Sequence, residues 1–141
     1  ETGLEVRVRP DLEIDLDGVR IGADLKTISM WNVKQESLRA RLHREIIERD
    51  YHLSAAMYCE TAALDQFFWI FVNKDENYHW IAIIEASAEL LELGMLEYRK
   101  AMRNIATGFD TGEWPAPITA DYTDELNDFD LRRLEALRTH A

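Results

Sequence analysis

The sequence predicts a small α/β domain, of the α+β kind, in which helices flank a mixed sheet in the order β-β-α-α-β-β-α. Three observations carry this prediction: an opening that alternates apolar and charged residues around a tight turn, two helical stretches in the middle, and two aromatic runs ahead of a long helix. With 141 residues, 47% of them hydrophobic, one globular domain is expected.

The opening of the chain predicts a strand followed by a β-hairpin. Residues 4–9 alternate apolar and charged side chains, and a period of two is typical of a half-buried strand. Residues 12–16 alternate in the same way, and Asp17-Gly18 is a dipeptide that favours a tight turn. The run 19–28 then returns as the second strand of the hairpin.

Two helices are expected next. Between 37 and 49, apolar residues recur at helical spacing among basic ones, which indicates an amphipathic helix with a basic outer face. Residues 53–63 are small and mostly apolar all round, which suits a buried helix. The arginines of the first helix, Arg39, Arg41 and Arg44, either reach a DNA backbone or belong to an ordinary solvated face.

The second half predicts two buried strands and a long helix. Residues 66–73 and 78–85 are aromatic and β-branched runs, so both are expected to be central strands covered on both faces. Ser87 is expected to cap a helix that runs through 106, with Gly108 as its stop. The side chains expected to face inward are Leu90, Leu91, Met95, Tyr98, Met102 and Ile105.

The chain divides into an expected core at 1–120 and an acidic tail at 121–141, with a short peripheral helix expected at 124–137. The net charge is -11, from 27 acidic and 16 basic residues, which argues against non-specific nucleic-acid binding. The acids concentrate late in the chain. Residues 1–50 hold nine basic and eleven acidic residues, so any site for a polyanion is expected there.

Cysteine content and hydropathy exclude further classes of protein. A single cysteine, Cys59, rules out an internal disulfide and a thiolate metal cage. No apolar run approaches the roughly 20 residues that a membrane span needs. A soluble intracellular protein is therefore expected.

The hairpin also gathers chemistry-bearing side chains. Asp11 precedes its first strand, and alternation in the second strand puts Asp24 and Lys26 on one face and Ala23 and Leu25 on the other. Two carboxylates at adjacent strand ends form an oxygen site for a hard divalent cation that also binds phosphate. A lysine on the same face can hold or deprotonate the attacking water and offset charge that develops on phosphorus. The alternative is a plain surface ion pair on an exposed strand.

Six short segments stand in order along the chain: Thr2-Gly3-Leu4, Arg7 to Asp11, Asp24-Leu25-Lys26-Thr27, Tyr51-His52, Ala55-Ala56-Met57-Tyr58 and Glu113-Trp114-Pro115. Together they resemble the nuclease domain of the exodeoxyribonuclease VIII family, in the PD-(D/E)xK superfamily found in phages and prophages. The resemblance implies a restriction-endonuclease-like core. It also implies a Mg²⁺-dependent exonuclease, with Mn²⁺ as the substitute ion, that degrades duplex DNA from its ends, 5′ to 3′, beside a single-strand annealing protein in recombination. A cytoplasmic location in a bacterial host, as a prophage product, and a homo-oligomeric state go with it.

The resemblance also implies a role for each site residue. Asp11 and Asp24 are the metal ligands, the carbonyl of Leu25 is a third ligand, and Lys26 is the catalytic lysine. Substrate-binding roles are implied for Arg9, His52, Ser54 and Tyr58. The family has glutamine four residues before the tyrosine, and the serine that replaces it here has less reach. For the lone histidine at a helix start, a capping or packing role is the alternative.

The family further places a helical acid and a histidine upstream of the hairpin, and the sequence starts at Glu1 without them. The sequence is therefore expected to be the C-terminal part of a nuclease domain. Two alternatives stay open. One is a truncated or decayed module that only binds DNA or protein, and the other is an endonuclease or junction-cleaving member of the same superfamily.

Overall fold

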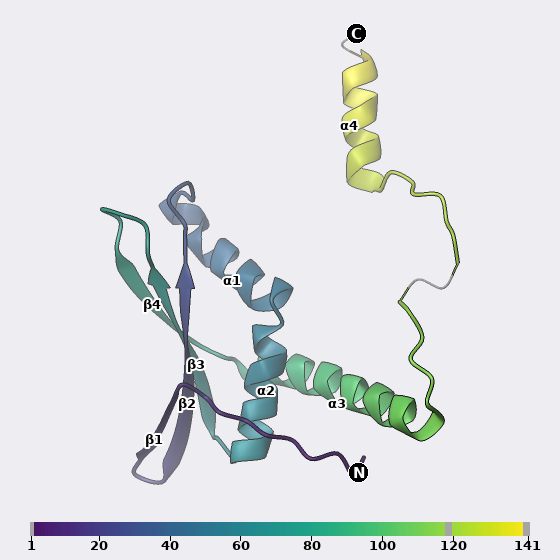
Figure 1. The fold of residues 1–141 in the computed structure, drawn as a ribbon. Helices are drawn as coiled ribbons and strands as arrows, with labels where there is room; N and C mark the ends of the chain where they lie inside the picture. Colours follow the sequence, from purple (N-terminus) through teal and green to yellow (C-terminus); the bar gives the residue numbers. More distant parts are fainter. Residues whose placement is uncertain (1, 118–119, 140–141) are drawn as a thin grey trace.

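The computed structural model describes residues 2–117 and 120–139, and its elements follow the predicted order, as Figure 1 shows. They are β1 (Leu12–Leu16), β2 (Val19–Ile28), the 3-10 turn η1 (Gln35–Ser37), α1 (Leu38–Glu48), α2 (Tyr51–Ala62), β3 (Gln66–Asn73), β4 (Trp80–Glu85), α3 (Ala88–Thr111) and α4 (Asp128–Thr139). The mixed α+β architecture is confirmed.

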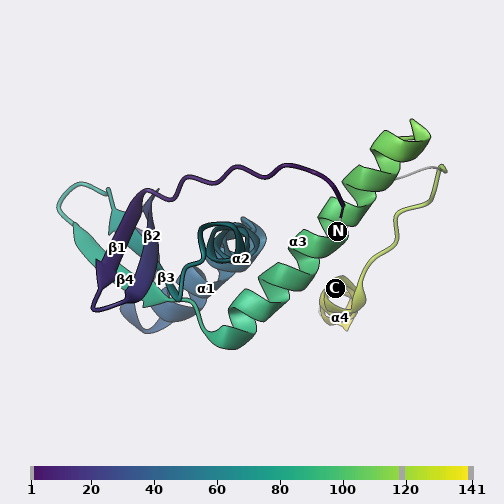
Figure 2. The same ribbon diagram turned by 90° about the horizontal axis from the view of Figure 1, so that it is seen from below.

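The four strands form one mixed sheet in the order β1-β2-β3-β4. β2 and β3 run parallel, whereas β1–β2 and β3–β4 are antiparallel pairs. Parallel strands need a crossover connection, and α1 and α2 supply it. Figure 2 shows the resulting layers: the sheet, then α1 and α2, then α3 packed on the far side of α2.

The tight turn between β1 and β2 forms as predicted. Asp17 (φ 51°) and Gly18 (φ 86°) both adopt the left-handed conformation, which is the combination of a type I′ turn and matches the twist of the flanking strands. The Gly18 N–H donates a hydrogen bond of 2.9 Å to Asp15 Oδ1. This turn sets the register of the whole hairpin.

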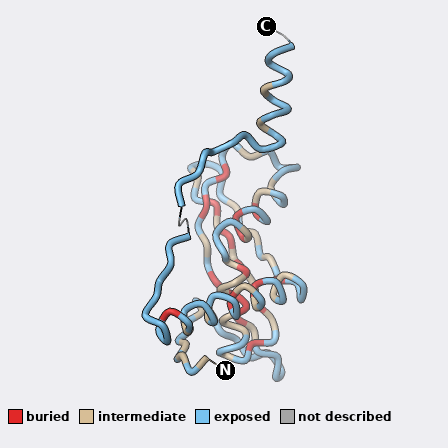
Figure 3. The backbone as a smooth tube through the Cα atoms, turned by 90° about the vertical axis from the view of Figure 1, so that its right-hand side faces the viewer, coloured by how far each residue is buried: buried red, intermediate tan, exposed pale blue. Residues whose placement is uncertain are grey.

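The core lies between the sheet and the first helical layer. β3 supplies three fully buried aromatic side chains, Phe67, Trp69 and Phe71, and α1 and α2 cover them with apolar residues such as Leu42 and Ala55. Burying a side chain of this size stabilises the fold by about 1.5–3 kcal/mol. Figure 3 shows most of the buried positions in the sheet and the helices packed on it, while α4 contains none.

The opposite face of the sheet, here called the open face, is covered by no described element. Cross-strand register places Leu25, Ile70 and Ile83 side by side on it, and Ile83 is 69% exposed. The expectation that 66–73 and 78–85 are both central strands covered on both faces is therefore wrong. β3 is central, β4 is an edge strand, and a helical layer covers only one of their two apolar faces.

Residues 4–9 do not form the predicted strand. They keep the alternation of partly buried and exposed side chains, but no described strand pairs with them. Leu4 and Val6 instead line a groove with Tyr98 and Met102 of α3, and Figure 2 shows the segment crossing from the sheet to that helix. A period of two arises wherever an extended chain lies along an apolar surface, with or without a ladder of hydrogen bonds.

The long helix α3 differs from prediction at its end. Ser87 caps it as expected, because its Oγ accepts a hydrogen bond of 3.1 Å from a first-turn N–H. The helix then continues past Gly108, against which the Trp114 ring packs, and ends at Gly112 with φ 74°. Ile105 is exposed rather than inward, because the second half of α3 extends beyond α2 (Figure 2).

The peripheral helix expected at 124–137 is present as α4 and starts at Asp128 instead. Asn127 Oδ1 accepts hydrogen bonds of 3.0 Å from the N–H groups of Phe129 and Asp130 and so fixes this start. None of the described helices, α4 included, combines the length and apolar character needed to cross a bilayer.

Gly94 allows α3 to pack directly on the backbone of α2. A Cβ at this position would lie 2.2 Å from the carbonyl oxygen of His52. We expect Gly94→Ala to destabilise the fold by about 1–3 kcal/mol, despite the better helix propensity of alanine, because backbone atoms cannot move aside. Urea unfolding measures this loss. Gly108→Ala is the matched control, since its Cβ meets only the side chain of Trp114, and equal midpoints for the two variants would contradict the described packing.

Candidate active site

The hairpin brings Asp11 and Asp24 together. Its register pairs Leu12 with Ala23, so the next residues outward, Asp11 and Asp24, face each other. The Asp11 N–H donates a hydrogen bond of 3.2 Å to Asp24 Oδ1, and the Leu25 N–H donates one of 2.9 Å to Asp11 Oδ2. Backbone groups therefore fix the orientation of both carboxylates.

The second oxygen of each carboxylate accepts no hydrogen bond from a described backbone group. Among the residues with described positions, Asp11 Oδ1 has no hydrogen-bond partner, and Asp24 Oδ2 lies 3.3 Å from Lys26 Nζ. Asp24 is only 5% exposed, and a buried carboxylate is costly unless it is paired. Two carboxylates beside one ammonium leave an excess negative charge, which a bound cation would neutralise.

The chemistry of these donors suits a hard divalent cation. The carboxylates of Asp11 and Asp24 and the carbonyl of Leu25 offer only oxygen, the ligand type that Mg²⁺ and Mn²⁺ prefer. No thiolate or imidazole belongs to this group, so a softer metal has no advantage. The residues present therefore fit a divalent ion of this type.

Two tyrosines of α2 border the acids and the lysine. Lys26 Nζ lies 4.5 Å from the centroid of the Tyr51 ring, close enough for a cation–π interaction. Tyr58 packs on Phe67, with ring centroids 5.7 Å apart. Burial raises the pKa of Tyr58 above its usual value, and the negative charge of Asp24 raises it further. The Tyr58 hydroxyl therefore stays protonated near the carboxylates and can donate a hydrogen bond.

Arg9 and Ser54, two other residues predicted to bind substrate, differ in their surroundings. Arg9 is exposed, at the end of the segment that leads into Asp11. Ser54 lies one helical turn before Tyr58, but its Oγ donates a hydrogen bond of 3.3 Å to the carbonyl of Asp50, the residue that precedes α2. The serine hydroxyl is thus engaged at the start of α2, and the hydrogen bonds of the two carboxylates with described residues do not include it.

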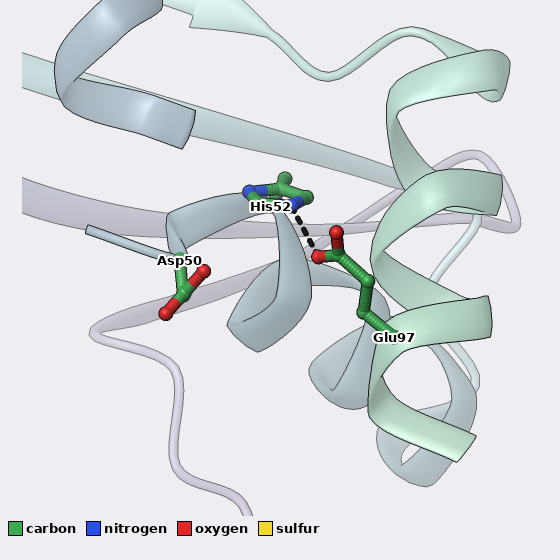
Figure 4. A group of neighbouring side chains, drawn as sticks. All are labelled: Asp50, His52 and Glu97. Carbon is green, nitrogen blue, oxygen red and sulfur yellow. Dashed lines mark hydrogen bonds and ion pairs between the residues drawn. The ribbon is translucent and has the colours of Figure 1, made fainter. Parts of the chain in front are cut away.

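His52 is held between α2 and α3, as Figure 4 shows. Its side chain is 1% exposed, Nδ1 lies 3.3 Å from the carbonyl oxygen of Ile46, and Nε2 lies 2.6 Å from Glu97 Oε2. Because a carbonyl oxygen only accepts, the first contact requires a proton on Nδ1. Tyr51 and Tyr58, by contrast, contact Phe71 and Phe67 of the sheet. Both ring nitrogens of His52 are therefore engaged, Nδ1 with the backbone of α1 and Nε2 with a side chain of α3.

Sequence reasoning did not find the group that His52 forms with Asp50 and Glu97. One potential ligand atom from each residue lies within 4.8 Å of the others, and imidazole with carboxylate is a donor set that suits zinc. The 2.6 Å contact of His52 with Glu97 is a direct hydrogen bond, however, which a shared metal ion would have to separate. We interpret this group as a link between the helices. No local motif signals it, because Glu97 is 45 residues from the histidine.

We expect His52→Ala to destabilise the fold by about 2–4 kcal/mol, because it leaves a cavity and removes a buried hydrogen-bonded link between the helices. Urea unfolding would show this as a lower midpoint. His43→Ala, at an exposed position of α1, is the matched control and should change stability by less than about 0.5 kcal/mol. A similar loss in both variants would contradict the structural role of His52.

A mixed four-stranded sheet that carries an acid and an acid-x-Lys pair on one hairpin defines a PD-(D/E)xK-type domain, that is, a nuclease-type fold. The model of the family described as PDDEXK-like domain of unknown function (DUF3799) matches residues 1–125, and the chain belongs to this family. No curated protein matches the chain. The superfamily predicted from the sequence is confirmed, whereas the closer resemblance to exodeoxyribonuclease VIII stays a prediction.

Proposed function

We propose that the chain is a Mg²⁺-dependent deoxyribonuclease that degrades duplex DNA from its ends. The observation that carries the proposal is the mutual placement of Asp11, Asp24 and Lys26: one oxygen of each carboxylate is fixed by a backbone N–H, and the ammonium lies 3.3 Å from Asp24. Membership of a PDDEXK-like family supports the same reaction class. Mn²⁺, with the same preference for oxygen ligands, is proposed as the substitute ion.

Each residue has a distinct part in the proposed hydrolysis. Asp11, Asp24 and the carbonyl of Leu25 hold the divalent ion, which polarises the phosphoryl oxygen when bound. Lys26 hydrogen-bonds the attacking water and offsets negative charge as the new P–O bond forms and the bond to the leaving oxygen breaks. Tyr58 supplies a neutral hydrogen-bond donor beside the carboxylates. Arg9, exposed next to Asp11, contacts a phosphate of the bound strand.

The proposal extends to the biological setting that the sequence resemblance implies. The enzyme acts in the cytoplasm of a bacterial host, in phage-type recombination, together with a single-strand annealing protein and as a homo-oligomer. Binding of a purified single-strand annealing protein, and the mass of the assembly in solution, test these points separately from catalysis.

Comparison of linear and closed-circular duplexes tests the reaction type. With Mg²⁺ the chain is expected to degrade the linear duplex and to leave the closed circle intact, because an exonuclease needs an end. Cleavage of the circle would favour the endonuclease or junction-cleaving alternative. Neither substrate should be cut when the ion is removed by chelation, and cutting that persists would contradict the metal site.

A second candidate function is a module that binds DNA without cutting it. The observation that favours it is the Ser54 hydroxyl, which donates to the carbonyl of Asp50 at the start of α2, whereas the glutamine of the resembling family has a longer side chain. Ser54→Gln distinguishes the two. If the unsubstituted chain binds Mg²⁺ and DNA but hydrolyses nothing, and Ser54→Gln restores hydrolysis, the chain is a binding module that has lost catalysis.

A further inference from the structure

A cleft lined by cationic side chains opens beside the Lys26 end of the candidate site. Its volume is about 330 Å³, and the ends of β2 and α1, the start of α2 and the turn after β3 form it. The cations that line it are Arg41, Arg49 and Lys74, and Glu45 is the acidic residue among them. This cleft is therefore locally positive in a chain whose formal net charge is -11.

Glu45 holds both arginines of the cleft in place. Its nearly buried carboxylate accepts a hydrogen bond of 3.2 Å from Arg41 Nη2 and one of 2.5 Å from Arg49 Nε. A guanidinium has five N–H donors, so each arginine keeps several for another acceptor. The hydrogen bond to Glu45 raises the pKa of Arg49 above its usual value. Both guanidinium groups are thus held in position and charged, and each retains N–H donors that can bind another acceptor.

The cleft is continuous with the candidate active site through Tyr51. This side chain lines the cleft, and its ring centroid lies 4.5 Å from Lys26 Nζ. Thr27, the residue after the lysine in β2, lines the cleft as well. Successive phosphates of one DNA strand are one nucleotide apart, with a rise of about 3.4 Å along the helix axis and a larger separation through space because the strand winds around that axis. A strand with one phosphate at Lys26 therefore has its neighbouring phosphate within reach of this cleft.

We propose that the cleft formed by Arg41, Arg49 and Lys74, here called the phosphate cleft, binds the phosphodiester next to the scissile one. The proposal rests on the proposed function, because it takes DNA as the ligand. It adds the direction in which the bound strand runs from the two carboxylates. Contacts of this kind position the strand without reading its bases, so binding is independent of sequence.

The other two arginines of α1 do not belong to the phosphate cleft. Arg39 lines a different groove, between α1 and β4, and Arg44 pairs with Glu48 on the outer surface, with Nε and Oε1 4.0 Å apart. Only one of the three arginines that the sequence offered as DNA contacts therefore faces the phosphate cleft. The other two supply controls of equal charge on the same helix.

The test compares two triple substitutions with the same change in charge. The first, Arg41→Gln with Arg49→Gln and Lys74→Gln, neutralises the phosphate cleft. The second, Arg39→Gln with Arg44→Gln and Lys100→Gln, neutralises exposed cations outside it. Binding of a short labelled duplex is measured by fluorescence anisotropy over a range of salt concentrations, with Ca²⁺ in place of Mg²⁺ because both ions take oxygen ligands.

The cleft variant is expected to weaken binding about 10-fold or more and to lower the slope of log K against log salt by about 2–3, roughly one for each lost phosphate contact. The control triple should leave the slope within about one of its original value. Equal losses in the two triples, or no binding of the duplex by the unsubstituted chain, would overturn the phosphate cleft.

A second pair of variants keeps the test valid if the first triple does not fold, since it leaves Glu45 buried without its partners. Lys74→Glu changes an exposed turn residue that has no ion pair in the described structure, and Lys100→Glu is its exposed control. Weaker binding by Lys74→Glu alone supports the cleft, and equal binding by both overturns it. Hydrolysis with Mg²⁺ is measured separately. If substitutions in the phosphate cleft weaken DNA binding but the unsubstituted chain hydrolyses nothing, only the proposed function is contradicted. If the chain hydrolyses DNA but these substitutions leave DNA binding unchanged, only the phosphate cleft is contradicted.

Discussion

Lys26→Ala is expected to slow hydrolysis of linear duplex DNA by about 10²-fold or more, because it removes the group that orients the water and offsets charge on phosphorus. Affinity for Mg²⁺ should change little, since an ammonium is not a ligand for a hard cation. The position of Lys26 allows the rate of hydrolysis to change without a change in Mg²⁺ affinity. Its Nζ lies 3.3 Å from one oxygen of Asp24, while the other oxygen of that carboxylate is held by the Asp11 N–H.

Single-turnover hydrolysis of a labelled linear duplex and calorimetric titration of Mg²⁺ measure the two effects of Lys26→Ala independently. Lys34→Ala is the matched control, because Lys34 is exposed in the loop after β2. If the Lys26 and Lys34 variants cut equally fast, the acid-x-Lys arrangement is an ordinary ion pair on a strand, and the proposed role of the lysine is wrong.

Asp24→Asn is expected to weaken binding of Mg²⁺ about 10-fold or more and to reduce hydrolysis to background, because one negatively charged oxygen ligand of the ion is lost. Asparagine keeps the shape of the side chain and an oxygen that can still accept from the Asp11 N–H. The hairpin should therefore stay intact. The two variants then differ in kind: Lys26→Ala retains the ion and loses the reaction, whereas Asp24→Asn loses both.

Calorimetry with Mg²⁺ and with Mn²⁺ checks the loss of affinity in Asp24→Asn, and urea unfolding checks that the variant is folded. Asp110→Asn, at an exposed position near the end of α3, controls for the loss of one negative charge from the chain. Undiminished affinity in the Asp24 variant would remove the metal site from this hairpin.

The carboxylate pair could be predicted from sequence because all its determinants are local. Asp17-Gly18 dictates a two-residue turn, this turn sets the register, and the register places Asp11 opposite Asp24. The same alternation puts Lys26 on the side of Asp24. The segment from Asp11 to Lys26 therefore contains all the residues that this argument uses, and none of it depends on how the helices pack.

Features that depend on packing between distant segments could not be predicted in this way. The His52–Glu97 hydrogen bond requires α3 to lie close to α2. This close approach depends on Gly94 of α3, which packs directly against the backbone of His52. The phosphate cleft combines four segments, and its Arg41 looks no different in sequence from Arg39. The alternating residues 4–9 carry a strand pattern, but the surface they meet is a helix.

The backbone of Leu25 contacts the candidate site, whereas its side chain lies on the open face of the sheet. Its N–H holds Asp11 at 2.9 Å, while its side chain lies 54% exposed on the open face. A layer that packs on the open face would restrain the same peptide that orients the metal-binding carboxylate. Such a layer and the divalent ion would then change each other's affinity by the same factor, because coupling free energy is reciprocal. Leu25 thus couples binding on the open face of the sheet to occupancy of the metal site on the opposite face.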